Sequence, residues 1–204
     1  MKIEVVSDVI CPWCYIGKRR LEKALELVGI KPADSKVEIH WLPFQLNPGM
    51  PREGIAREEY RKAKFGSLER GRELDARVAA EGRGEGIDFA FELIERTPST
   101  VAAHQLIALA QAQGKNVVEP LFKAYFEDAR DIGDPAILKS IAEENGVAGW
   151  PQAADEKQVA ALEESLRGLG IQAVPTFLFD RKLGVSGAHP PQALAAAIKQ
   201  ALSR

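Results

Sequence analysis

The stretch DVICPWCYIG, Asp8–Gly17, holds both cysteines of a 204-residue chain. Cys11 and Cys14 are separated by two residues, where a predicted strand (2–7) ends and a predicted helix (12–28) begins. Two thiols within one helical turn do not cross-link distant parts of a chain. The pair is therefore interpreted as redox-active, metal-binding or incidental rather than as a structural disulfide.

The composition is that of a globular protein with one domain, or with one domain and an insertion. Hydrophobic residues make up 46% of the chain and charged residues 27%, which are ordinary values for soluble proteins. The formal net charge is -2 and the two signs are mixed along the sequence, so nucleic acid and membrane are excluded as partners. No apolar run is long enough for a signal peptide or a membrane span, which predicts a cytoplasmic protein.

The beginning of the chain predicts a strand, a helix and a second strand. Residues 2–7 and 36–42 have the composition or the alternation of strands, and 12–28 has the period of an amphipathic helix. A strand–helix–strand unit favours two parallel strands joined by a crossover helix.

The middle of the chain is predicted to be helical, and strands return at its end. Residues 175–180 and 182–187 predict a hairpin around Arg181, and 190–202 predicts a closing helix. The helices of the middle are predicted at 53–65, 67–81, 99–113, 116–129, 135–145 and 152–168, with a loop at 81–86.

The two ends of the chain therefore resemble each other in pattern, whereas the middle differs. Both ends combine strands with an amphipathic helix. This order predicts an α/β domain made of residues 1–46 and 171–204, interrupted by a helical domain at 47–170.

Cys11 is predicted to be a nucleophile because it stands at the end of a strand and the start of a helix. Free backbone N–H groups and the positive end of the helix dipole meet there, and both favour a thiolate. Pro12 has no N–H and suits the first helical position. Trp13 adds apolar surface beside the sulfur.

Cys14 is predicted to be the resolving thiol. Residues three apart share a helical face, with Cβ atoms about 5–6 Å apart, a separation that adjusts to disulfide geometry. Cys14 is shielded by the first turn, so it would attack a mixed disulfide on Cys11 and release the partner. No metal site is expected, because zinc needs four ligands and the histidines lie far apart at His40, His104 and His189.

Several longer motifs resemble one known family. The segment SDVICPWCYIGKRRLEKAL (7–25) is similar to the active-site segment of the DsbA-like thioredoxin-fold oxidoreductases. The resemblance is strongest to the FrnE-like branch, which is related to 2-hydroxychromene-2-carboxylate isomerases and kappa-class glutathione transferases. It covers nearly the whole chain, through FQLNPGMP (44–51), STVAAHQL (99–106), FEDARDIGDPAIL (126–138), AVPTFLFD (173–180) and GVSGAHPP (184–191).

This resemblance implies a thioredoxin fold with an inserted all-helical domain. It also implies that the bond between Val174 and Pro175 is cis and that both residues lie beside Cys11. The backbone of Val174 would then be open to a substrate peptide that adds as a strand.

Three further residues each have two open interpretations. Asp8 either polarises the thiol environment or is a local cap, and Lys18 either favours the thiolate or belongs to a solvated face. His104 either lines a groove between the two domains or is satisfied within helical packing. Ser99 stands where related proteins commonly have asparagine.

The resemblance implies two function classes. The first is a thiol-disulfide oxidoreductase that needs no cofactor, acts through Cys11 and Cys14 on polypeptide or low-molecular-weight disulfides, and has glutathione as a candidate co-substrate. The second is a glutathione-dependent isomerase or transferase. Those relatives usually have serine at the first position and lack the second thiol, so the two cysteines favour the first class. A peptide-binding module without catalysis would leave the dithiol without a purpose.

Overall fold

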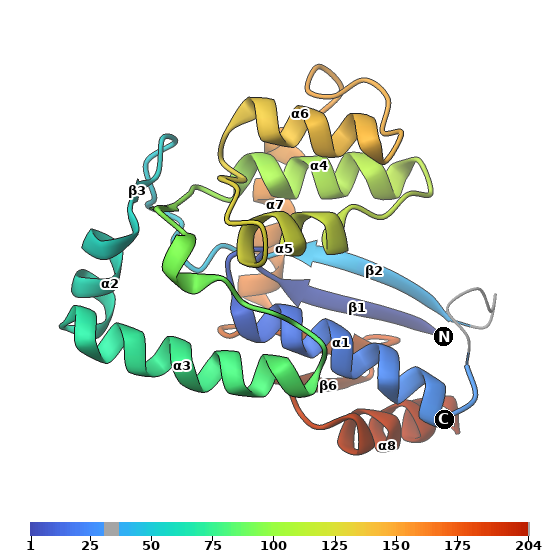
Figure 1. Ribbon diagram of the computed structural model, residues 1–204. Coiled ribbons are helices and arrows are strands. Elements are labelled where there is room, and N and C mark those ends of the chain that lie inside the picture. The colour runs from blue at the N-terminus through green and yellow to red at the C-terminus, as the bar shows by residue number, and fades with distance from the viewer. Residues whose placement is uncertain (31–36, 204) are drawn as a thin grey trace.

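The computed structural model describes residues 1–30 and 37–203. Its centre is a four-stranded sheet in the order β2-β1-β5-β6 (Figure 1). β2 is parallel to β1, whereas β5 and β6 follow in antiparallel pairs, so the predicted parallel pair and hairpin are confirmed. The bounds are β1 (Lys2–Ser7), β2 (Glu38–Pro43), β5 (Thr176–Phe179) and β6 (Leu183–Ser186). The predicted start of the second strand at residue 36 lies outside the described residues.

The inner strand β1 joins the two ends of the chain. Every residue of β1 except Lys2 is buried, as expected for a strand with neighbours on both sides. Val5 pairs with Trp41 on β2 and with Phe177 on β5. Because β1 and β5 are antiparallel neighbours, the C-terminal end of β1 lies beside the N-terminal end of β5. This brings the segment after residue 7 next to the segment before residue 176.

Helices α1 (Pro12–Leu27) and α8 (Pro191–Leu202) pack against each other below the sheet in Figure 1. Each begins with a proline at a first helical position, where the missing N–H is not needed. α1 and α8 turn apolar faces inward, and Leu21 and Ile198 are both buried. The two helices therefore share one buried apolar interface.

The inserted segment is mostly helical, and its helices α4, α5 and α6 lie above the sheet in Figure 1. α4 and α7 both contact β2. The bounds are α2 (Arg57–Phe65), α3 (Leu68–Gly84), α4 (Val101–Ala112), α5 (Val118–Phe126), α6 (Pro135–Glu144) and α7 (Glu156–Gly168), with a 3₁₀ turn at Phe91–Leu93 and the short strands β3 (Ile55–Ala56) and β4 (Arg96–Thr97).

The structure differs from the predicted elements mainly around residues 81–86. The loop predicted there is wrong at its start, because α3 continues to Gly84. Gly82 does not end the helix; a Cβ at this position would overlap the ring of Phe89. The glycine is thus used for close packing. The pairing of β3 with β4 was not predicted, since two residues are too few to produce an alternating pattern.

One hydrophobic core extends through both parts of the chain. It includes Val5, Phe177 and Leu194 from the two ends and Phe122 from the inserted segment. A shared core does not mark where one domain ends and the next begins. The domain boundaries at 46/47 and 170/171 therefore stay a prediction. Within residues 1–30 and 37–203, no helix has the length and apolar character needed to cross a bilayer.

Candidate active site

Cys11 lies at the N-cap of α1, directly after the loop that follows β1. Its backbone is extended, with φ -94° and ψ 110°, and its N–H donates a 3.0 Å hydrogen bond to the carbonyl of Asp8. The side chain is 6% exposed. The backbone carbonyl of Cys11 accepts from the N–H of Cys14 at 3.0 Å, so the residue begins the helix, while its side chain makes no cap hydrogen bond.

Cys14 lies in the first turn of α1 and is fully buried. Both cysteines are free thiols. Burial raises the pKa of the Cys14 thiol, and the adjacent Cys11 raises it further, whereas the Asp8 backbone and the Ser7 hydroxyl oppose the change. The two thiols thus differ in their surroundings, and Cys14 is held in its protonated form.

The turn before β5 lies against Cys11, as the order of the sheet requires. The Cys11 thiol faces the carbonyl of Val174, with Sγ 3.9 Å from the oxygen. The Val174–Pro175 peptide bond is cis. Pro175 is buried and Val174 is half-buried. Two residues predicted to bind substrate are therefore next to Cys11, and Val174 is 163 positions away from it in the sequence.

Gly17 allows Pro175 to approach α1. A Cβ on Gly17 would lie 2.9 Å from Cγ of Pro175 and 3.2 Å from Cζ of Phe177, which is closer than packed carbon atoms tolerate. This role of Gly17 was not predicted from the sequence. A glycine inside a helical pattern was the signal, because such a glycine usually has a packing reason.

The two residues between the cysteines form the outer surface of the site. Pro12 is half-buried at the first position of α1, and Trp13 is 39% exposed. An exposed indole is a large apolar surface with a polar N–H. Trp13 therefore presents an exposed apolar surface two residues after Cys11.

Asp8 and His104 form a buried pair behind the dithiol. Asp8 is not a local cap: its Oδ2 accepts a 2.8 Å hydrogen bond from the N–H of Leu46. Its Oδ1 has no hydrogen-bond partner among the described residues and lies 3.5 Å from Nε2 of His104. That nitrogen donates to the carbonyl of Phe44 at 3.2 Å. His104 is thus satisfied within the packing, and it also lines a cavity of about 230 Å³.

The comparisons with known proteins agree with this fold. A model of the DSBA-like thioredoxin domain matches residues 2–199. The chain belongs to this family. It is 31% identical to a probable DsbA oxidoreductase from Streptomyces coelicolor, with a TM-score of 0.87 and coverage of 100% of this chain and 91% of the other.

Two other members of the comparison are more distant. The uncharacterized protein YwbO of Bacillus subtilis (strain 168) is 28% identical over 186 residues, which are 86% of this chain and 85% of YwbO. The cytosolic disulfide reductase DsbM from Pseudomonas aeruginosa, solved with GSH, is 17% identical with a TM-score of 0.61 and coverage of 100% of both chains. At that identity DsbM shows a shared fold alone.

In this DsbA-like chain Lys18 does not belong to a solvated face. The residue is 6% exposed, and its Nζ lies 2.6 Å from a carboxylate oxygen of Glu22 and 2.6 Å from one of Glu119. Its charge is thus compensated by two carboxylates, one on α1 and one on α5. A lysine compensated in this way ties α1 to the inserted helices.

Proposed function

We propose that this DsbA-like protein is a thiol-disulfide oxidoreductase in which Cys11 attacks and Cys14 resolves. The observation that carries the proposal is the difference between the two thiols. Cys11 is the N-cap residue of α1 and its thiol faces the carbonyl of Val174. Cys14 is fully buried, and the pKa of its thiol is raised. Only one thiol is placed to meet a substrate first.

In the reductive direction, the Cys11 thiolate attacks one sulfur of a substrate disulfide. A Cys11–substrate disulfide forms, the substrate S–S bond breaks, and the leaving thiolate takes up a proton. Cys14 then loses its proton and attacks the sulfur of Cys11, which releases the second substrate thiol. The substrate gains two electrons and the protein becomes the Cys11–Cys14 disulfide; the oxidative direction is the reverse.

An extended polypeptide is the substrate class that we propose. Within the described residues the N–H of Val174 donates no hydrogen bond, and the carbonyl of Val174 meets only the Cys11 thiol. Both groups are the ones that an added strand would use. Pro12, Trp13 and Pro175 would supply the apolar walls, and His104 with its cavity would border the same region.

The alternative activity is glutathione-dependent isomerisation or transfer, and it does not require a second thiol at position 14. Glutathione fits the proposal instead as the thiol that reduces the Cys11–Cys14 disulfide and completes the cycle, so no other cofactor is needed. The DsbM structure with GSH is compatible with this use of the fold. We place the activity in the cytoplasm, as for that cytosolic reductase.

The test is reduction of insulin disulfides by dithiothreitol, with wild type, Cys11→Ser and Cys14→Ser in parallel. Cys11→Ser should fall to the rate of dithiothreitol alone, and Cys14→Ser should accumulate a mixed disulfide on Cys11. Equal activity in Cys11→Ser and wild type would rule out the dithiol mechanism. Turnover of 2-hydroxychromene-2-carboxylate with glutathione, in the absence of insulin reduction, would favour the isomerase. Equilibration of the wild-type couple with glutathione then gives the direction of the reaction.

A further inference from the structure

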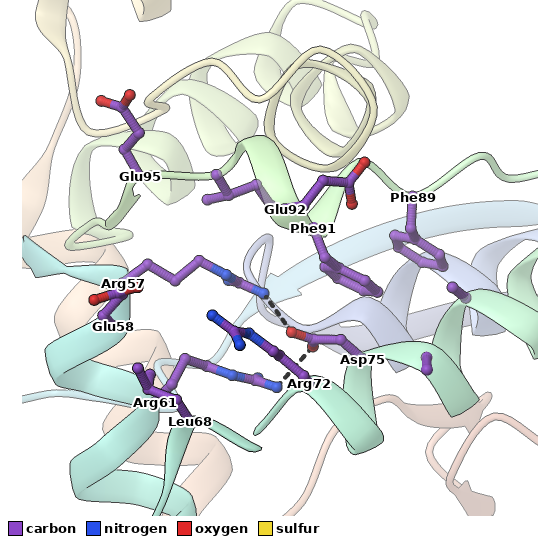
Figure 2. Close-up of a pocket in the computed structure, with 13 residues that line it drawn as sticks. Arg57, Glu58, Arg61, Leu68, Arg72, Asp75, Phe89, Phe91, Glu92 and Glu95 are labelled. Carbon is purple, nitrogen blue, oxygen red and sulfur yellow. Dashed lines mark hydrogen bonds and ion pairs between the residues drawn. The ribbon is translucent and has the colours of Figure 1, made fainter. Parts of the chain in front are cut away.

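A second cavity, of about 610 Å³, lies between α2, α3 and the segment 89–95 (Figure 2). Its volume is in the range of sites for small molecules. None of the residues of the dithiol site lines it. Part of the wall is aromatic, because Phe89 and Phe91 stack with ring centroids 4.6 Å apart and planes 7° from parallel. Ala79 and Ile94 extend this apolar surface.

Three arginines extend from two helices into this cavity. Arg57 and Arg61 are one turn apart on α2 and therefore share a helical face, and Arg72 comes from α3. Figure 2 shows the guanidinium groups of Arg57 and Arg61 directed at one carboxylate, that of Asp75, with the guanidinium group of Arg72 between them. The aromatic wall is close to them, since the Arg57 guanidinium lies 5.4 Å from the ring centroid of Phe91.

Asp75 does not balance the arginines. Arg57 Nη2 lies 3.3 Å from Oδ2 and Arg61 Nη2 lies 2.8 Å from Oδ1 of this one carboxylate. Arg72 forms no ion pair or hydrogen bond within residues 1–30 and 37–203. Arg61 also donates to the carbonyl of Gly71. Each guanidinium has five N–H donors, so all of those of Arg72 and some of those of Arg57 and Arg61 are left for a ligand.

The positive charge is also partly removed from water. The side chains of Arg57 and Arg61 are 11% and 13% exposed. Burial lowers the pKa of Arg61, and the charge of Arg57 lowers it further, although Asp75 opposes this. An anion between the guanidinium groups would therefore relieve a repulsion that the fold leaves in place.

The rim of the cavity limits how much negative charge a ligand can carry. Glu58, Glu92 and Glu95 line the cavity and are exposed, and Figure 2 shows Glu92 and Glu95 pointing away from the arginines. Three rim carboxylates repel polyanions such as nucleotides. A ligand with a single negative charge is repelled less, because that charge can lie between the guanidinium groups and away from the rim.

We propose that this arginine pocket binds a small organic acid with one anionic group and a flat apolar body, such as an aryl carboxylate. The carboxylate accepts paired hydrogen bonds from the guanidinium groups, a geometry that arginine favours. The flat body lies against Phe89 and Phe91. This site is separate from the dithiol and does not depend on the proposed redox activity.

Calorimetric titration with 2-naphthoate tests the proposal, with neutral 2-naphthamide and inorganic phosphate as comparison probes. The wild-type chain should bind 2-naphthoate at least tenfold more tightly than either probe. Arg72→Gln should weaken 2-naphthoate binding about tenfold, since it removes a charge-assisted hydrogen bond. The matched control is Arg77→Gln, an exposed arginine of α3 outside the cavity, which should change the affinity less than twofold.

A second variant separates shape from charge. Ala79→Leu fills the apolar wall without changing any charge, and it should also weaken binding of 2-naphthoate. Insulin reduction and the circular dichroism spectrum should stay as in wild type in all three variants. Equal affinity for the acid and the amide would overturn the proposal, as would equal effects of Arg72→Gln and Arg77→Gln. Binding of phosphate as tight as that of 2-naphthoate would overturn the assignment of a flat apolar ligand.

Discussion

The dithiol site and the arginine pocket use polar groups in opposite ways. At the dithiol site the polar side chains are buried and hold distant segments together, as Asp8 holds Leu46. In the arginine pocket Arg57 and Arg61 pair with Asp75 across α2 and α3, but Arg72 is exposed without a partner in the described chain. Substitution of Asp8 should therefore lower stability, whereas substitution of Arg72 should affect mainly ligand binding.

Asp8→Ala should have the largest effect on stability, about 3 kcal/mol, because it leaves the buried N–H of Leu46 without its acceptor and opens a cavity beside His104. The measurement is urea denaturation with the m-value compared between variants. Asp8→Asn keeps an acceptor for Leu46 and should cost less. Asp88→Ala, at an exposed aspartate, should change stability by under about 0.5 kcal/mol. A loss at Asp8 as small as that at Asp88 would remove the basis of the difference between the regions.

Gly17→Ala should cost about 2 kcal/mol, because the new methyl group overlaps the ring of Pro175 and neither α1 nor the turn yields freely. Insulin reduction should slow as the turn before β5 is displaced. Gly84→Ala is the matched control, since a Cβ there meets nothing within 4 Å. That control should be neutral or stabilising by up to about 1 kcal/mol. If both alanines stabilise the protein, the close contact of Gly17 with Pro175 is not a constraint.

Glu163→Gln should show a smaller effect that depends on pH. Burial raises the pKa of Glu163, but hydrogen bonds from Gln45 and Arg167 outweigh it, so the pKa is lowered overall. The carboxylate accepts from the Gln45 N–H at 2.8 Å. Its contribution, about 1 kcal/mol, is therefore complete above the unfolded pKa of about 4.3 and is lost as pH falls through the lower folded pKa.

Denaturation of wild type and Glu163→Gln at several pH values between 7 and 3 measures this contribution. The two curves should differ at pH 7 and approach each other below about pH 4. Glu164→Gln, at the exposed neighbouring residue, should follow wild type throughout. A constant gap between wild type and Glu163→Gln would show that the effect is one of shape and not of charge.

Arg72→Gln should have the smallest effect on stability, below about 0.5 kcal/mol, even though it should weaken ligand binding about tenfold. Urea denaturation without ligand measures the first quantity. A loss of stability comparable to that of Asp8→Ala would mean that the arginine pocket is a structural element of the fold.

The dithiol could be predicted from sequence because its signals are local. Cys11, Pro12 and Cys14 fall within one turn that follows a strand, and the family resemblance supplied Val174 and Pro175. The order of the strands, with β1 antiparallel to β5, accounts for their meeting. Most helices were also predicted, since their apolar periods are long.

Contacts between distant segments left no comparable signal. The carboxylate of Asp8 accepts a hydrogen bond from the N–H of Leu46, and Lys18 forms an ion pair with Glu119. The separation of these residues in the sequence predicts neither contact. The arginine pocket has only a partial signal: Arg57 and Arg61 share a helical face, but their approach to Asp75 depends on how α2 turns into α3. Neither the composition nor the hydrophobic periodicity of the sequence predicts the angle between these two helices.

Because β1 pairs with β5, the dithiol site combines segments that the ribosome synthesises at different times. Cys11 leaves the ribosome 163 residues ahead of Val174, which at about 5–20 residues per second is roughly 8–30 s of synthesis. During that time the nascent chain carries both thiols without β5 and without the carbonyl that faces Cys11. Cys11 and Cys14 are therefore synthesised well before the turn that covers Cys11 in the folded chain.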